Sequence, residues 1–467
     1  MSSIIKELEK EYIEKHPRSR ELYQRALKCY PSGVTHDARY TEPFPIYTVK
    51  AEGVKKWDVD GNEYIDYIMG HGALLLGYGD ERVIAALQDQ LPKAIHMGSC
   101  TELEIEWAEL IQEIIPSARN GLVRATSCGT EAVLMAIRLA RSYTGREKVV
   151  LHAGCYHGKG DTTIYAFTAP PIGVYNVRGI PKGVRDDVII IPYNNLEMVE
   201  EAFETGSVAC IVLQGNAPYT KEYIQGLRRL THQYGVVFIL DEVVSGLRYA
   251  LGGAQEYYGV TPDLSALGKI VGGGAPIGAI CGKAEILDLY SFKDDYWNRF
   301  VRIRVGGTWN AQPLTIVGGI ATMKILKEER NTIYPNLYRI GKRLTKSFNE
   351  EAEDLGVAAI ASGLPPENPT TFSLNLLNRP IPPEKLYLWE TGPKTFEDYR
   401  VKDGFKAGKE AFHANYLSLI NNGIMSFKGS SFITCTKHTE EDLRKTEEAF
   451  AEALRVLKEN RLVGLAK

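Results

Sequence analysis

The sequence lacks the features by which membrane, secreted and nucleic-acid-binding proteins are most easily recognised. No apolar run approaches the ~20 residues that a membrane helix needs, and the first ten residues are charged, without the apolar core of a signal peptide. The net charge is −3, from 55 basic and 58 acidic side chains that form no basic block. We therefore expect neither a membrane nor a nucleic acid as a partner.

Cysteine is scarce and scattered. The seven cysteines never form a C-x-x-C pair, and they stand at positions 29, 100, 128, 155, 210, 281 and 435. An odd and dispersed set of this kind argues against a disulfide framework and against a zinc site. We therefore expect no metal site, and we expect a reducing, cytoplasmic location.

Two nucleotide-binding signatures are also missing. A phosphate loop needs a Gly, four residues, and then Gly-Lys-Ser/Thr. Here Gly268-Lys269 is followed by Ile270, and Asp263 stands where the first Gly should be. The run 272–274 lacks the Gly-x-Gly-x-x-Gly spacing of a dinucleotide fingerprint. Both classes are excluded by residue type.

The middle of the chain has the pattern of an α/β fold. From about residue 80 to 285, short apolar runs rich in Val and Ile alternate with helical stretches. The runs lack the two-residue alternation of a strand with one wet face, so they predict strands covered on both faces. Helices between them predict a large domain with a mostly parallel sheet flanked by helices. The runs are 122–126, 148–152, 188–192, 209–213, 236–240 and 277–281.

The two ends of the chain predict a smaller α+β domain. Residues 1–28 have the pattern of one amphipathic helix, and residues 45–68 that of a hairpin or meander. After about residue 330, long helices flank short strands, and a last helix is predicted over 439–462. The segment 364–405, rich in Pro and charge, predicts an irregular excursion. The predicted ranges are 1–75 for the N-terminal part of the small domain, 76–328 for the large domain and 329–467 for the C-terminal part.

One lysine and one acid point to a particular cofactor. Lys269 precedes a glycine run, and Asp241 ends the buried-looking run 236–240. Pyridoxal phosphate (PLP) chemistry needs an amine that forms a Schiff base with the cofactor aldehyde. It also needs a carboxylate that keeps the pyridine nitrogen protonated, so that the ring accepts electrons. Lys269 and Asp241 are the candidates for these two roles.

Other strand ends offer the remaining contacts of such a cofactor. Gly129 and Thr130 open a helix, where backbone N–H groups favour a phosphate. Tyr156 can stack on a pyridine ring, and Val243 can press on its other face. His157 is a further neighbour. The alternatives are an ordinary helix cap for Thr130 and a packed loop histidine for His157.

Taken together, these segments resemble class III aminotransferases of PLP fold type I. The resemblance runs from about residue 20 to 455 and is closest to the branch that holds glutamate-1-semialdehyde aminomutase, D-phenylglycine aminotransferase and β-phenylalanine aminotransferase. It rests on Asp58-Val-Asp-Gly61, Ser127-Cys-Gly-Thr-Glu-Ala132, Cys155-Tyr-His-Gly158, Asp241-Glu-Val-Val-Ser-Gly-Leu-Arg248, Lys269 and Gly306-Gly-Thr308.

The resemblance implies further roles and shows two departures. It implies that Arg39 binds the substrate carboxylate. It also implies a homodimer with shared active sites, in which Thr308 reaches the phosphate held by the other subunit. Cys128 stands in the phosphate loop where the family usually has serine, and Gln214 stands where it usually has a glutamate that pairs with a mobile arginine. Gln214 therefore argues against a pocket that accepts glutamate by that switch.

The function predicted from the sequence is a PLP-dependent aminotransferase that moves an amino group from an amino acid to a keto acid. Lys269 would act as the general base once it is freed from the cofactor. The alternatives are an aminomutase that moves the amino group within one substrate, an amino-acid racemase or epimerase, and a non-catalytic PLP-binding scaffold. The first two alternatives use the same lysine and acid, so the motifs do not separate them from the aminotransferase.

Overall fold

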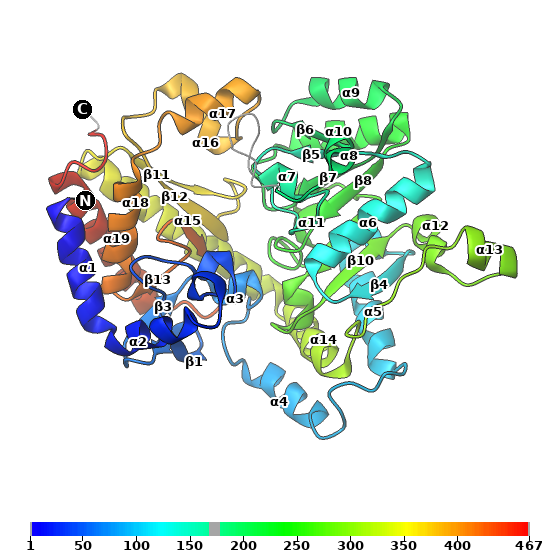
Figure 1. The fold of residues 1–467 in the computed structure, drawn as a ribbon, viewed down its shortest axis with the longest axis horizontal. Coiled ribbons are helices and arrows are strands. Elements are labelled where there is room, and N and C mark those ends of the chain that lie inside the picture. The colour runs from blue at the N-terminus through cyan, green and yellow to red at the C-terminus, as the bar shows by residue number, and fades with distance from the viewer. Residues whose placement is uncertain (1, 168–177, 466–467) are drawn as a thin grey trace.

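The computed structural model describes residues 2–167 and 178–465. The remaining residues, 1, 168–177 and 466–467, lie outside the described part. Each of the three predicted domain ranges contains one of these groups. Figure 1 shows both chain ends on the left of the molecule, whereas the middle of the chain forms the right half. Among the described residues, none of the helices combines the length and apolar character that crossing a bilayer requires.

A sheet with the strand order β4-β10-β9-β8-β7-β5-β6 forms the centre of the right half (Figure 1). Neighbours are parallel from β9 to β6, and β10 is antiparallel to both β4 and β9. The mostly parallel sheet predicted from the sequence is present, with one strand reversed. The strands are β4 Leu122–Thr126, β5 Lys148–His152, β6 Val188–Ile191, β7 Val208–Gln214, β8 Val237–Asp241, β9 Leu264–Gly268 and β10 Gly278–Gly282.

The sequence prediction missed β9. Its residues, Leu-Ser-Ala-Leu-Gly, include none of the β-branched or aromatic types that favour strands, although all five are buried. Pairing to parallel β8 on one side and antiparallel β10 on the other determines its conformation. As a result Lys269 follows directly on a buried parallel strand.

Helices cover both faces of the sheet, because successive side chains of a strand point to opposite sides. In β7, Cys210 and Val212 pack with residues of α6, whereas Ile211 and Leu213 pack with α9 and α10. The helices of this half are α4 Glu81–Gln90, α5 Glu102–Ile114, α6 Gly129–Thr144, α7 Ile164–Phe167, α8 Lys182–Asp186, α9 Leu196–Glu204, α10 Lys221–Tyr234, α11 Gly253–Tyr258, α12 Ala284–Leu287, α13 Asp295–Phe300 and α14 Pro313–Glu328.

A separate core cluster joins the two chain ends. Tyr12 near the N-terminus packs in the same cluster as Phe348 and Phe450. Two small sheets accompany it, with the orders β1-β2-β3-β13 and β11-β12-β14. Three antiparallel strands confirm the meander predicted over 45–68, whereas the domain bounds stay a prediction. The strands are β1 Thr48–Glu52, β2 Lys55–Asp58, β3 Glu63–Asp66, β11 Ala359–Gly363, β12 Thr371–Leu376, β13 Ile424–Met425 and β14 Ser431–Ile433.

The helices of the chain ends differ from the prediction in two places. The helix expected over 1–28 is broken at His16, because Pro17 starts a new helix and restricts the residue before it. The segment 364–405 is only partly irregular, since it contains β12 and two helices. The helices are α1 Ser3–Lys15, α2 Pro17–Ala26, α3 Met69–Gly72, α15 Arg330–Asp354, α16 Tyr387–Glu390, α17 Phe396–Asp403, α18 Lys409–Asn421 and α19 Glu440–Glu459.

Candidate active site

The carboxyl ends of the parallel strands meet at one edge of the sheet, where a cavity of about 660 Å³ opens. Ligands of open α/β sheets bind at this edge. The lining includes every predicted site residue except Thr308, namely Arg39, Cys128, Gly129, Thr130, Tyr156, His157, Gln214, Asp241, Val243 and Lys269.

Lys269 stands at the centre of this edge in a strained conformation. Its φ of 53° lies in the left-handed region, directly after the extended Gly268 at the end of β9. Burial, with a smaller contribution from the charge of Arg248, lowers the pKa of the lysine amine, while Asp241 acts in the opposite direction. A strained backbone that carries a buried amine of lowered pKa into a cavity is typical of a functional lysine.

Asp241 is buried at the end of β8 and is held from two sides. Its Oδ1 accepts a hydrogen bond from the backbone N–H of Val243 at 3.0 Å, and its Oδ2 lies 2.8 Å from Nδ1 of His157. Burial disfavours the charged form of His157, but the contacts with Asp241 and Cys155 outweigh burial and raise its pKa to about 9. His157 therefore carries a proton at neutral pH and places a positive charge beside the carboxylate of Asp241.

The N-terminus of α6 forms the opposite wall of the cavity. Its cap residue, Cys128, makes no side-chain cap hydrogen bond, so the first N–H groups of the helix face the cavity without a side-chain partner. A Cβ atom added to Gly129 would lie 2.6 Å from both methyl groups of Val243. Only glycine therefore allows α6 to begin this close to the residues that follow β8.

Tyr156 and Gln214 are tied together at the cavity wall. The backbone N–H of Tyr156 donates to Oε1 of Gln214 at 2.6 Å, and Nε2 of Gln214 donates to Oδ1 of Asn216 at 2.8 Å. Both polar ends of the amide are occupied within the chain. Gln214 therefore positions the loop that carries Tyr156.

Arg39 lies at the other side of the cavity with two histidines that the sequence analysis did not select. Nη1 of Arg39 donates to Oγ1 of Thr35 at 2.7 Å. The rings of His36 and His71 are 4.9 Å apart, and Phe427 lies 5.1 Å beyond His71. Burial, followed by the charges of His36, Arg39, Lys269 and Lys56, lowers the pKa of His71 to about 4. His71 is therefore neutral at physiological pH.

Arg248 is a second residue whose position the sequence did not reveal. It is fully buried, and it donates to the carbonyl oxygens of Gly72 and Thr434, each at 2.9 Å. A Cβ added to Gly72 would lie within 4.0 Å of both Arg248 Nη2 and Lys269 Cδ. Burial lowers the pKa of Arg248 to about 10. The run Gly-Leu-Arg at 246–248 was visible in the sequence, but its partners come from both chain ends.

Thr308 is not part of this cavity. It is exposed, in a segment where Trp309 packs against His96 and Asn310 accepts a hydrogen bond from Ser127 at 3.1 Å. The segment thus touches the phosphate-loop region of its own chain, while Thr308 itself stays outside the lining. The role in a partner subunit's site that the sequence analysis gave Thr308 remains a prediction.

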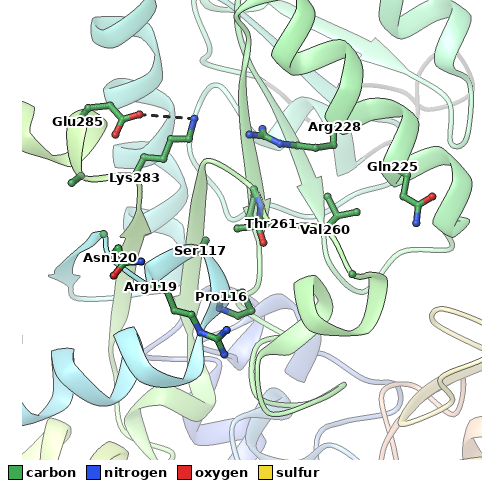
Figure 2. Close-up of a pocket in the computed structure, with 14 residues that line it drawn as sticks. Pro116, Ser117, Arg119, Asn120, Gln225, Arg228, Val260, Thr261, Lys283 and Glu285 are labelled. Atoms are coloured by element: carbon green, nitrogen blue, oxygen red, sulfur yellow. Dashed lines mark ion pairs between the residues drawn. The ribbon is translucent and has the colours of Figure 1, made fainter.

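A different pocket of about 560 Å³ lies away from these residues (Figure 2). Arg228 and Lys283 are its most prominent cations, but both bind the carboxylate of Asp263 at 2.9 Å. Lys283 also pairs with Glu285 at 3.9 Å. With Arg228 and Lys283 paired to carboxylates and none of the predicted site residues in its lining, this pocket does not compete with the cavity at the sheet edge as the candidate active site.

Comparison with known proteins agrees with this geometry. Residues 36–362 match the profile of the family described as aminotransferase class-III, and the chain belongs to that family. It is therefore an enzyme of the class that the sequence predicted, and the predicted α/β fold class is confirmed.

Individual relatives are similar over nearly the whole chain. A protein of Chlorobium luteolum named glutamate-1-semialdehyde 2,1-aminomutase is 36% identical over 450 residues, which cover 93% of this chain and 97% of the relative. The structure of an omega-transaminase from Sphaerobacter thermophilus has a TM-score of 0.80 and 31% identity, covering 94% of this chain and 97% of that one. A structure described as a transaminase with PLP bound has a TM-score of 0.81 and 27% identity, covering 95% and 99%.

Proposed function

We propose that this chain is a PLP-dependent aminomutase of the glutamate-1-semialdehyde type, which moves an amino group between neighbouring carbons of one substrate. Relatives that are 33–38% identical carry that name. The observation that carries the proposal is the fixed, neutral Gln214, because an enzyme with a single substrate needs no acidic switch for glutamate. Aminotransferase is the main prediction from the sequence, and the relatives favour the aminomutase alternative.

The residues of the cavity fit pyridoxal phosphate. The free N–H groups at the start of α6, with Thr130, suit its phosphate. Tyr156 and Val243 lie in the same lining for the two faces of its ring, and Lys269 offers the amine for covalent attachment. Bound there, the cofactor would supply an electron sink for the carbon that carries the substrate amine.

The chain's own groups have distinct tasks in this proposal. Lys269 moves a proton at its Nζ, which its lowered pKa favours. Asp241, supported by His157, holds a proton at the ring nitrogen. Arg39 binds the carboxylate of the substrate, since a guanidinium can hold a carboxylate through two hydrogen bonds. Gln214 keeps the loop of Tyr156 in place.

The test is turnover without any keto acid. Holoenzyme mixed with glutamate 1-semialdehyde alone should convert it to the isomer with the amine on carbon 1 and the carbonyl on carbon 2. Mass spectrometry should show a product with the same mass as the substrate, and NMR should identify it as this isomer. A reaction that proceeds only when a keto acid is added would refute the aminomutase proposal.

The second candidate is the aminotransferase of the original prediction. The omega-transaminase structure, at 31% identity, is the observation that favours it. With Gln214 in place of an acid, we expect such an enzyme to use 2-oxoglutarate poorly. After the enzyme has taken up an amino group from a donor, the absorption spectrum of the unreacted holoenzyme would return faster with pyruvate or aryl keto acids than with 2-oxoglutarate.

A homodimer with shared sites belongs to the same proposal. Large apolar side chains are exposed beside the Thr308 segment, including Ile95, Met97 and Trp309, which is 56% exposed. An obligate interface covers apolar surface of this kind. A cytoplasmic location rests on the seven unpaired cysteines.

A further inference from the structure

Another cavity, of about 390 Å³, lies in the half of the molecule that the chain ends form, between the small sheet β11-β12-β14 and the helices α16 and α17 (Figure 1). Leu388 and Trp389 of α16 pack in one cluster with Leu377, which directly follows β12, so the helices cover this part of the sheet. Ser431 lines both this cavity and the active-site cavity. The two spaces share no other lining residue.

The sheet side of the cavity is polar. Ser373 of β12 and Ser431 of β14 are paired in register, and directly opposed residues of antiparallel strands point to the same face. In the described part of the chain, neither hydroxyl makes a hydrogen bond. The neighbouring pair, Phe372 and Phe432, stacks at 5.0 Å on the opposite face and lines the active-site cavity. Two free hydroxyls thus lie behind strands that border the active site.

The helix side of the cavity carries a lysine without an acidic partner. Nζ of Lys402, in α17, donates to the carbonyl oxygen of Leu388 at 2.6 Å and lies 5.3 Å from the centre of the Trp389 ring. Within the described residues, no Asp or Glu forms an ion pair with it. Burial, followed by the charge of Lys406, lowers the pKa of the Lys402 amine to about 8, and no carboxylate acts in the opposite direction.

The cavity as a whole has one uncompensated positive charge. Lys406 also lines it, but Lys406 pairs with Asp403 at 2.8 Å, and both of these side chains are more than half exposed. All residues of the lining are described, and none of them is Asp or Glu. A desolvated ammonium group without a counter-charge is unfavourable, and buried charges in proteins are generally paired. A ligand with a single negative charge would supply the partner that Lys402 lacks.

The remaining walls of the cavity are apolar. Trp389 is 4% exposed, and the edge of its ring packs against Phe405 at 5.7 Å. Phe412 and Leu377 extend this apolar surface. Walls of this kind suit the hydrocarbon or aryl part of a small molecule, and the volume is in the range of small-molecule sites. An inorganic anion would make no use of them.

We infer that this cavity binds a small organic monocarboxylate, whose charge Lys402 neutralises and whose apolar part packs against Trp389. The hydroxyls of Ser373 and Ser431 are then donors to the carboxylate oxygens, and hydrogen bonds to a charged group are the stronger ones. The site goes beyond the proposed function and does not depend on it, because Lys269 does not line this cavity.

Protection of Lys402 from acetylation tests the inference in the unaltered holoenzyme. The protein is treated with N-acetoxysuccinimide, and peptide mass spectrometry follows the acetylation of Lys402 while phenylacetate is added as the probe. The rate should fall along a saturable curve, to about one tenth at ten times the half-protecting concentration, because only unoccupied protein reacts. Lys394 lies over the ring of Tyr387 but does not line the cavity, so its rate should stay unchanged.

Two further compounds decide what the cavity recognises. Phenylacetamide, which has the same shape but no charge, and inorganic phosphate should give no protection at the same concentrations. Equal protection by phenylacetamide, protection by phosphate alone, or no protection by phenylacetate would each overturn the inference. In Arg39→Ala, which lacks the guanidinium of the active-site cavity, phenylacetate should still protect Lys402. Loss of protection in that variant would place the probe at the active site and overturn the inference as well.

Matched variants give an independent measurement by calorimetry. In the Arg39→Ala background, Lys402→Met should weaken the binding of phenylacetate by roughly 10- to 100-fold, the loss expected for a hydrogen bond to a charged group. Lys394→Met removes an exposed lysine that lies over another aromatic ring of α16, and it should leave the affinity unchanged. Equal affinities in folded Lys402→Met and Lys394→Met proteins would overturn the inference. If Lys402→Met does not fold by circular dichroism, the protection experiment decides, since it uses the unaltered lysine.

Discussion

The pair of His157 and Asp241 predicts a pH dependence of stability. The pKa of His157 is about 9 in the folded protein, against an ordinary value of 6.5. Because the folded protein binds this proton more tightly than the unfolded chain, the contribution is fully present below about pH 6.5 and is lost as the pH rises through about 9. The difference corresponds to about 3 kcal/mol.

The variant that tests this is His157→Asn, whose amide can still donate a hydrogen bond to Asp241 but carries no charge. Free energies of unfolding are measured in urea from about pH 6 to about pH 10, under conditions where fluorescence and circular dichroism transitions coincide. The advantage of the unaltered protein over the variant should shrink by about 3 kcal/mol across this range. Other titrating groups are common to both proteins and cancel in the difference.

His232→Asn is the matched control, because His232 is exposed in the last turn of α10. It reports how the loss of an exposed imidazole changes the free energy of unfolding over the same pH range. If the effect of His157→Asn follows that of the control, or increases as the pH rises, then His157 does not carry the extra proton and the account of its support for Asp241 is wrong.

The remaining predictions concern the cofactor, the substrate and the dimer. Lys269→Ala should lose the absorption band of the covalently bound cofactor and reduce turnover by roughly 10²–10⁴-fold or more, and retention of both would reject this assignment. Arg39→Lys should raise KM for amino acids about 10-fold while sparing simple amines, so equal losses for both would count against a carboxylate site. Gly129→Ala should weaken cofactor binding, measured by titration of the apoenzyme, because its Cβ meets Val243 at 2.6 Å; Gly183→Ala, which meets nothing within 4 Å, is its control. Mixed Thr308→Ala and Lys269→Ala subunits should regain activity through one intact site, and no recovery would show that the sites are not shared.

The sequence revealed those site residues that stand directly after strands. Asp241 and Lys269 could be predicted because buried strands that end in polar groups meet at one edge of a parallel sheet. That reasoning held even though β9 was missed, since the lysine and the glycine run after it were recognisable on their own. The alternation of apolar runs and helices likewise sufficed for the large sheet.

The residues that the sequence did not reveal depend on tertiary contacts. His71 reaches the cavity because Gly70 and His71 both have positive φ values, a backbone turn that no side-chain pattern announces. Its neighbour Phe427 comes from the far end of the chain. The reversal of β10 also lies beyond sequence patterning, because a fully buried strand looks the same in either direction.

Arg248 has a consequence for the order in which the protein matures. Its guanidinium joins carbonyl groups of Gly72 and Thr434 beside Lys269, so three distant parts of the chain meet at one buried cation. During synthesis the large sheet is complete before residue 434 exists, and until then Arg248 lacks one of its two acceptors. The complete set of hydrogen bonds around Arg248, next to Lys269, can therefore form only after residue 434 has been synthesised.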